Sequence, residues 1–427
     1  MSIVQNIARR PGWLFSLLLV VVIGGCDVLD NALDVQAPSR IPAGSLEDPS
    51  DADLLVLGAV GDFECALNAY IVLGALTGDE FTDATQTAAR WVYDRREVRS
   101  DDGIYAESSC TNLGTYTPLS VARWSAENAL VRLQDFTDAE VTNRQALVAK
   151  AAMYSAFSHL LLGEGFCSGV LLNESLEAGA EVQSEDLFQR AIERFTQAIT
   201  AAQAVGNDTI LNASLIGRAR ARLDLGDYAG AADDAREVVE GFELVATASG
   251  GSARRQNRIY QQSIISEAVS VGPAFRNLVF GGTADPRVEV IDTGDEATDG
   301  TPIFLQTKYR DVGDPVPVAT WTEAQLIIAE AEARVGDPQE AVDIINMFHA
   351  RAGLPAFTST DQAEIIDHVI QERSRELFLE GQRFYDIRRL SLPLVPAPGT
   401  PFDNGGDYGD TRCWPLPDVE ILNNPNI

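Results

Sequence analysis

Residues 371–390 read QERSRELFLEGQRFYDIRRL and lie in a predicted helix over 361–390. At 3.6 residues per turn, four charged residues share one face and three more are placed for ion pairs. These are Glu372, Glu376, Glu380 and Arg383, with Arg373, Asp386 and Arg389. Gly381 interrupts the helix at a cost of about 1 kcal/mol relative to alanine, so we expect another segment to pass close to it. A solvated, salt-bridged surface helix is the alternative interpretation.

The middle of the chain repeats a short turn pattern. Gly-Asp-(Tyr or Pro)-x-x-Ala occurs at residues 226–231 and again at 336–341. We expect glycine to end one helix in the left-handed conformation, aspartate to cap the next, and alanine to let the two helices approach. This is the pattern of tetratricopeptide repeats, in which each unit of about 34 residues is one helical hairpin.

Extending this pattern predicts a mostly α fold built from about four tetratricopeptide-like hairpins. The helix pairs are 120–135 with 142–162, 184–204 with 210–225, 228–240 with 320–335, and 338–350 with 361–390. Three segments rich in Gly, Asp, Pro and Thr are predicted to be irregular: 79–118, 244–319 and 391–427. Loops carried on a rigid scaffold are where ligand and partner contacts are expected.

The N-terminus predicts export and a lipid anchor. Arg9 and Arg10 precede an apolar run over 13–23, which is too short to span a bilayer and is typical of a signal peptide, residues 1–25. Two glycines stand directly before Cys26, so cleavage would leave Cys26 as the lipidated residue, with 26–45 as a tether. An ordinary signal peptide with an incidental cysteine is the alternative. The remainder, 46–427, is predicted to be one domain.

The formal net charge of −31 excludes nucleic acid as a partner. Residues 1–25 contain two arginines and no acid, so the mature chain carries −31 − 2 = −33. A surface this acidic repels phosphate backbones.

Four further cysteines predict two disulfides. Cys65, Cys110, Cys167 and Cys413 are an even number in a chain sent to an oxidising compartment. Three pairings are possible, and we favour Cys65–Cys110 together with Cys167–Cys413, which would staple the tail onto a helical hairpin. Four free buried thiols are the alternative. None of these cysteines has a close Cys or His partner in sequence, so no zinc site is expected.

The motifs together are similar to one known family. The charged helix at 371–390 is followed by WPLPDVEI at 414–421 and NNP at 423–425, which resembles the C-terminus of the SusD/RagB family. Further similar stretches are Leu73–Glu80, Trp124–Ala129, Leu211–Arg220, Asp285–Arg287, Lys308-Tyr309 and Asn346–Pro355. In the last of these, His349 replaces the first arginine of the family motif. Gly163–Val170 departs from the family's Tyr-Gly-x-x-Pro, so the resemblance does not define the local loop there.

The resemblance implies a function as well as a fold. Members of the family are outer-membrane lipoproteins that capture a nutrient for a TonB-dependent, SusC-like transporter. It therefore implies a lipid-anchored, cell-surface protein whose ligand is an oligosaccharide or, alternatively, a peptide. No cofactor is implied.

Aromatic residues in the first irregular segment are the candidate ligand contacts. Sugar rings stack their C–H faces on aromatic side chains, and Trp91, Tyr93, Tyr105 and Tyr116 cluster in 79–118. The alternative is that Trp91 and Tyr93 alternate along a short strand packed on the scaffold.

Candidate catalytic and metal-binding residues are few. The three histidines, His159, His349 and His368, each fall within a predicted helix. We find no His-x-x-x-His or His-Glu pairing, so we expect packed or surface residues and no imidazole metal site. Nucleophile elbows and phosphate-binding loops are absent from the sequence. The acidic loop 403–410 could hold calcium or be a plain mobile loop.

Three function classes therefore remain. The first is a nutrient-binding lipoprotein without catalytic residues, and the second is a repeat-type scaffold of an envelope complex that binds no small ligand. The third, a glycosidase, needs only two carboxylates about 5 to 10 Å apart. Such pairs arise by chance among 63 acidic residues and point to no particular site.

Overall fold

The computed structural model describes residues 48–173 and 175–427. The predicted signal peptide, Cys26 and the tether lie outside these residues. Residues 49–427 form one compact unit built mainly of helices. The mostly α class is confirmed.

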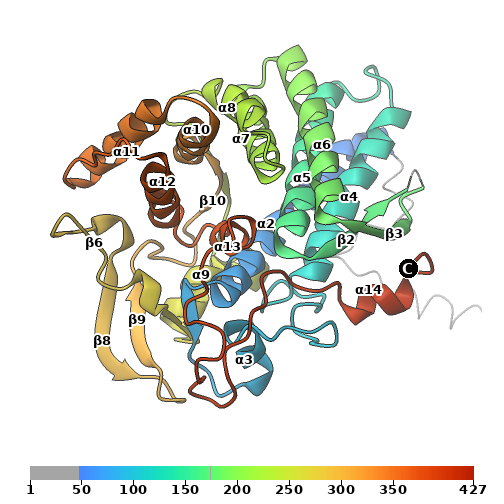
Figure 1. Ribbon diagram of the computed structural model, residues 1–427. Coiled ribbons are helices and arrows are strands. Elements are labelled where there is room, and N and C mark those ends of the chain that lie inside the picture. The colour runs from blue at the N-terminus through green and yellow to red at the C-terminus, as the bar shows by residue number, and fades with distance from the viewer. Residues whose placement is uncertain (1–47, 174) are drawn as a thin grey trace, which may run out of the picture. The chain divides into compact units, whose positions relative to one another are not determined.

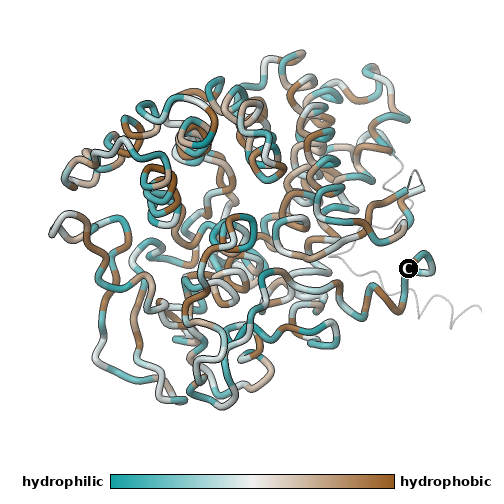
Figure 2. The backbone as a smooth tube through the Cα atoms, in the orientation of Figure 1, coloured by the Kyte–Doolittle hydropathy of each residue, from teal (hydrophilic) through white to brown (hydrophobic). Residues whose placement is uncertain are grey.

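Eight helices stack side by side in chain order (Figure 1). They are α4 (Tyr116–Asp135), α5 (Arg144–Gly165), α6 (Ser184–Val205), α7 (Asp208–Asp224), α8 (Tyr228–Arg236), α10 (Trp321–Val335), α11 (Pro338–Ala352) and α12 (Gln362–Glu376). Each packs against the next, as stacked hairpins require. Apolar and polar positions are interspersed along most of them, because a helix at the surface of the stack buries only one face against its neighbours (Figure 2).

The repeated turns behave as expected in their aspartates and only partly in their glycines. Gly226 ends α7 at φ 77°, and the Asp227 carboxylate accepts the backbone N–H of Gly230 at 3.0 Å. Asp337 likewise caps α11 by accepting the N–H of Gln339 at 2.9 Å. Gly336, however, has φ −114°, so the left-handed prediction is wrong at the second turn. Helix α10 ends instead with a hydrogen bond from the Gly336 N–H to the carbonyl of Glu332.

A long apolar helix, α2 (Ala52–Thr77), packs against α4 and α5 and lies outside the predicted hairpins. Within the described residues, Pro49–Thr77 and α5 are long and apolar enough to cross a membrane by length and composition. Most of the apolar window of each is buried inside the protein. Core helices have this character, so α2 and α5 are the interior of the unit.

The predicted helix over 361–390 is two helices. α12 ends at Glu376, and α13 (Arg383–Arg389) begins after a turn in which Leu379 and Gly381 have φ of 56° and 88°. A methyl group on Gly381 would lie 3.0 Å from Cγ1 of Ile71. The segment that passes close to Gly381 is therefore α2, and the close approach breaks the helix.

The charged residues of this stretch are buried or half-buried, so the solvated surface-helix alternative is wrong. Arg373 Nε lies 3.1 Å from Asp386 Oδ2, and Arg389 lies 2.7 Å from both Asp386 and Glu330 of α10. Arg383 reaches across to Asp79 at 2.7 Å. Buried carboxylates that pair with guanidinium groups remain ionised, and the pKa of Asp386 falls to about 2 because the neighbouring Arg373 and Arg389 outweigh the effect of burial.

The irregular segments carry short antiparallel strand pairs. In the described residues these are β1 (Phe81–Asp83) with β5 (Val269–Val271), β2 (Ser168–Leu172) with β3 (Ala178–Gln183), β4 (Glu243–Ala246) with β10 (Val316–Thr320), β6 (Val279–Phe280) with β7 (Thr283–Ala284), and β8 (Val290–Glu296) with β9 (Pro302–Gln306). Short helices complete them: α3 (Ala88–Asp94), α9 (Arg258–Tyr260) and α14 (Asp418–Asn423).

Two disulfides fasten irregular segments to the helices, in the pairing that the sequence favoured. Cys65 of α2 is bonded to Cys110, with Cα atoms 5.7 Å apart. Cys167, just after α5, is bonded to Cys413 of the tail, with Cα atoms 5.0 Å apart. The neighbouring Trp414 is fully buried and donates its indole N–H to Thr77 at 3.0 Å. The tail is thus anchored on α2 and α5.

Candidate functional site

Three of the four candidate aromatic residues are interior residues. Tyr93, Tyr105 and Tyr116 are at most 3% exposed. Tyr93 Oη accepts the backbone N–H of Tyr105 at 3.0 Å, while the hydroxyls of Tyr105 and Tyr116 donate to Pro415 O and to Glu420. Their rings pack in the core and present no face to a ligand. The sequence placed Trp91 and Tyr93 on a possible strand, whereas they lie on helix α3.

Trp91 is half-buried and held in one orientation. Its indole N–H donates to the carbonyl of Thr85 at 2.8 Å, and its ring lies 6.5 Å from that of Phe402, centroid to centroid. An indole fixed at one edge loses little conformational entropy when a ligand stacks on it.

The three predicted irregular segments meet beside this ring. Gln86 Nε2 donates to Thr298 O at 2.7 Å, and Asn404 Nδ2 donates to Asp299 Oδ2 at 3.0 Å. Arg95 donates to Gly405 O at 3.0 Å. We name the surface formed by Gln86, Trp91, Arg95, Asp299 and Asn404 the Trp91 shelf.

Buried polar groups support the shelf from below. Arg90 pairs with Asp83 at 2.8 Å, and Asp94 accepts the backbone N–H of Asp83 at 2.7 Å. Burial raises the pKa of Asp94 to about 8. These bonds lock α3 against β1, so the shelf is organised before any ligand arrives.

The shelf combines the groups that recognise a sugar. An indole face matches the C–H face of a pyranose ring. Amide, carboxylate and guanidinium side chains at its rim offer both donors and acceptors to hydroxyl groups. The arrangement can bind and orient a polyhydroxylated ligand.

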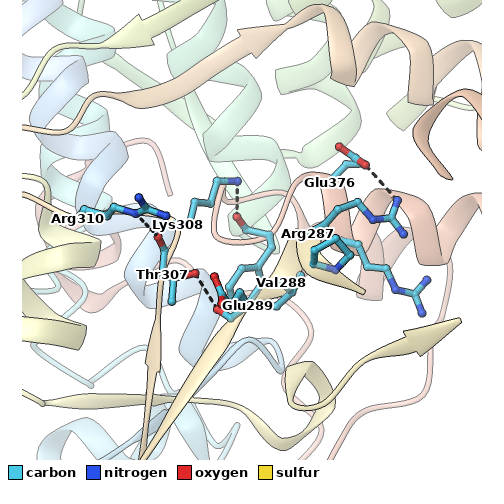
Figure 3. Close-up of a pocket in the computed structure, with 10 residues that line it drawn as sticks. Arg287, Val288, Glu289, Thr307, Lys308, Arg310 and Glu376 are labelled. Atoms are coloured by element: carbon cyan, nitrogen blue, oxygen red, sulfur yellow. Dashed lines mark hydrogen bonds and ion pairs between the residues drawn. The ribbon is translucent and has the colours of Figure 1, made fainter. Parts of the chain in front are cut away.

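A concave site that includes no residue of the shelf lies between the end of α12, β9 and the turn before β8 (Figure 3). This cavity of about 430 Å³ is lined by Pro286, Arg287, Val288, Glu289, Thr307, Lys308, Arg310, Arg375, Glu376 and Phe378. Arg287 faces Glu376 at 3.0 Å (Figure 3). Lys308 lies 2.6 Å from Glu380, which is not one of the lining residues. Phe378, its one aromatic residue, is buried. The single aromatic residue of this cavity is therefore closed to a ligand, whereas Trp91 is half-buried, so we favour the Trp91 shelf as the candidate site for stacking a sugar ring.

The histidines divide into two kinds. His159 is a packed core residue of α5, as expected, and its Nδ1 lies 2.9 Å from Ser155 O. His349 of α11 and His368 of α12 are packed as well, but the prediction of no His-Glu pairing is wrong, because the two rings approach to 3.3 Å beside Glu372. Their separation of 19 residues on two helices concealed the contact. The His368–Glu372 spacing of four residues on one helix was the available sequence signal.

A family model matches the C-terminal region of this chain, and known proteins resemble part of its sequence or its fold. The family model described as the SusD family matches residues 314–427. SusD-like protein P38 of Formosa agariphila is 28% identical over 138 aligned positions, in a match that covers 28% of this chain and 26% of that protein. SusD-like protein P2 of the same organism is 36% identical over 125 residues, 25% of this chain and 23% of that protein. The matches thus span about a quarter of the length of these curated relatives.

Solved structures match far more of the chain. A SusD superfamily protein from Parabacteroides distasonis superposes with a TM-score of 0.69 at 15% identity, covering 91% of this chain and 98% of that one. A SusD-like carbohydrate binding protein from Bacteroides vulgatus gives 0.68 at 16% identity, covering 89% and 97%. At 15–16% sequence identity, these matches show a shared fold and nothing beyond it.

Proposed function

We propose that this chain, which belongs to the SusD/RagB family, binds an oligosaccharide on the Trp91 shelf and delivers it to a TonB-dependent outer-membrane transporter. It acts by capture and release, without a covalent step. The observation that carries the proposal is the meeting of three irregular segments around one half-buried, hydrogen-bonded indole. A structural neighbour described as carbohydrate binding supports the ligand class.

The proposed location follows from the N-terminal sequence and the family. Acylated Cys26 would anchor the protein in the outer membrane, with residues 46–427 at the cell surface. The helical stack offers an extended surface that suits a protein partner. The SusC-like transporter would contact this stack, while the shelf on the irregular segments receives the ligand.

Binding is tested with residues 46–427 and their Trp91→Ala variant. Calorimetric titration against neutral oligosaccharides, acidic oligosaccharides and peptides identifies the ligand class, with a neutral oligosaccharide expected. Removing the stacking face costs about 1.5 kcal/mol or more, so Trp91→Ala should bind at least about tenfold more weakly. Equal affinity of variant and parent for the ligand found would refute the shelf.

Trp124→Ala is the matched control. Trp124 is 44% exposed on α4 and is no part of the shelf, so its removal should leave sugar affinity unchanged. Both variants should keep the parent's circular dichroism spectrum.

The partner is tested separately, by purifying the full-length protein from native membranes. A TonB-dependent transporter is expected to co-purify. Co-purification of a transporter together with no binding to any member of the panel would favour the scaffold alternative.

A further inference from the structure

Two histidines and a glutamate form a buried cluster between α11 and α12. His349, His368 and Glu372 are at most 5% exposed. His349 Nε2 lies 3.3 Å from His368 Nε2 and 3.2 Å from Glu372 Oε1, and His368 Nε2 lies 3.7 Å from the same oxygen. Within the described residues, no other group of three such side chains is close enough to hold a metal ion. The acidic loop 403–410 is therefore not such a group.

These three distances match the dimensions of a metal site. For a triangle with sides of 3.2, 3.3 and 3.7 Å, the point equidistant from all three atoms lies about 2.0 Å from each. Zinc binds histidine nitrogen at about 2.0–2.1 Å and carboxylate oxygen at about 2.0–2.2 Å. We infer that His349, His368 and Glu372 bind a divalent transition metal ion, Zn²⁺ above all.

The tautomer of His349 favours a ligand role. Its Nδ1 lies 2.7 Å from the carbonyl oxygen of Pro355, which can only accept, so Nδ1 carries a hydrogen. In the neutral ring the lone pair is then on Nε2, facing the Glu372 carboxylate at 3.2 Å. Two acceptors at this distance repel each other unless a cation or a second ring proton lies between them. In metal sites, the imidazole nitrogen that does not bind the metal usually donates its hydrogen to a carbonyl or carboxylate, which fixes the ring orientation.

The carboxylate is oriented in the same way. Arg287 donates to Glu372 Oε1 at 3.1 Å and also to Oε2, and is itself held by Asp285 at 2.7 Å. Each carboxylate oxygen has two lone pairs, so Oε1 can accept from Arg287 and still face the cluster. Arg287 thus fixes the ligand without occupying the metal position.

Aromatic rings enclose the imidazoles. Phe357 stacks on His368 with centroids 4.1 Å apart, and Phe280 lies 4.5 Å from His349 and 5.0 Å from His368. Phe280 belongs to strand β6 and is half-buried, so it covers the cluster on the hairpin side. Two nitrogen ligands and apolar walls select zinc-like ions over calcium or magnesium, which prefer oxygen.

The decisive measurement is zinc stoichiometry. Metal ions are removed from residues 46–427 with a chelator, and Zn²⁺ alone is then titrated into the protein. High salt suppresses weak, nonspecific binding of the ion to the acidic surface. One tight equivalent per chain is expected, with a rise in melting temperature. Co²⁺ in place of Zn²⁺ should give the intense visible absorption of a tetrahedral, nitrogen-ligated ion.

Two ligand variants and one control make the test specific. His349→Arg restores the arginine of the family motif and can pair with Glu372, so it should fold yet bind Zn²⁺ at least tenfold more weakly. His368→Gln should lose the ion to the same degree. Asp403→Asn with Asp407→Asn, in the acidic loop, should leave the stoichiometry unchanged.

Two results would overturn the inference. One is a wild-type protein that takes up no tight equivalent of Zn²⁺ and gives Co²⁺ no tetrahedral spectrum, in which case the cluster is held by a second ring proton. The other is zinc binding of equal strength in both folded ligand variants, which would place the ion elsewhere. If neither variant folds, the Co²⁺ spectrum of the wild type decides.

Discussion

The helical stack and the irregular segments are held together in different ways. Each helix of the stack packs on its neighbour in sequence, from α4 through α12. The irregular segments are fastened by contacts between distant residues, such as Cys167 with Cys413 and Asn404 with Asp299. Arg96, which is buried, donates to the carbonyls of Gly78 and Val395. A locally determined scaffold therefore carries the Trp91 shelf, which forms only when distant segments meet.

Buried ion pairs lie between helices of the stack and where the stack meets α13, and we call this layer the seam. Glu330 of α10 meets Arg389 of α13, and Arg389 also meets Asp386. In α7, Arg220 lies 2.9 Å from Glu323 of α10. Breaking such a pair leaves an uncompensated buried charge, so the largest effects on stability are expected here.

Glu330→Ala should give the largest loss. The substitution removes a carboxylate that lies within 4 Å of both Arg389 and Arg373. It should therefore lower the free energy of unfolding, measured by urea titration, by about 3–5 kcal/mol. Glu193→Ala is the control, because Glu193 pairs with Arg190 on the exposed side of α6 and should change stability by less than about 1 kcal/mol. Equal losses of stability in Glu330→Ala and Glu193→Ala would contradict the distinction between buried and exposed ion pairs.

Removing each disulfide in turn compares a bond between distant residues with a bond between nearer ones. Replacing both Cys167 and Cys413 with serine should lower stability by about 2–5 kcal/mol. The Cys167–Cys413 bond joins residues 246 apart in sequence and the Cys65–Cys110 bond residues 45 apart. Because a longer closed loop restricts the unfolded chain more, the loss should exceed that of the Cys65–Cys110 double variant by about 1.5 kcal/mol. Chemical unfolding of both double variants measures the difference, and the reverse order would contradict it.

The seam should also make stability depend on pH. Glu80 is fully buried and accepts the N–H of Leu379 at 2.8 Å, and burial raises its pKa from 4.5 to about 8. The folded state therefore holds a proton that the unfolded state releases, so this contribution is complete below pH 4.5 and lost as pH rises through 8.

For Glu80 the slope between these values is at most about 1.4 kcal/mol per pH unit. Asp94, whose pKa burial also raises to about 8, adds a slope of the same sign. Glu80→Gln keeps an acceptor for Leu379 and should flatten the profile measured by thermal unfolding from pH 5 to 8.5. An unchanged slope in the variant would show that Glu80 does not titrate in this range.

Gly381→Ala should have the smallest effect. Its φ of 88° costs an alanine about 1–2 kcal/mol, and the added methyl group would press on Ile71. Gly399→Ala is a useful comparison, because Gly399 has a similar φ of 82° and open space around its Cβ position. A larger loss at position 381 than at 399, in denaturant melts, would measure the close approach of α2 apart from backbone strain.

The stack could be predicted from sequence because its signals are local. The prediction for 184–204 agrees with α6 at Ser184–Val205, since apolar spacing and capping residues act within one helix. The helix predicted over 361–390 failed at Gly381, because its break depends on α2, some 300 residues away in sequence. Periodicity carries no information about such a contact.

The proposed binding surface, the Trp91 shelf, could be predicted only as a region. Sequence identified the irregular segments and Trp91, but the three tyrosines near it fill the core. Aromatic residues serve packing and ligand stacking equally well, and only burial separates these roles. Gln86, Asp299 and Asn404 come from three separate segments, so their meeting could not be read from spacing.

The most direct test of the central claim is a crystal structure of residues 46–427 with the oligosaccharide selected by titration. We expect a sugar ring stacked on the face of Trp91, with its hydroxyls bonded to side chains of the shelf. A sugar bound in the cavity beside Arg287 and Lys308, with the shelf empty, would contradict the account.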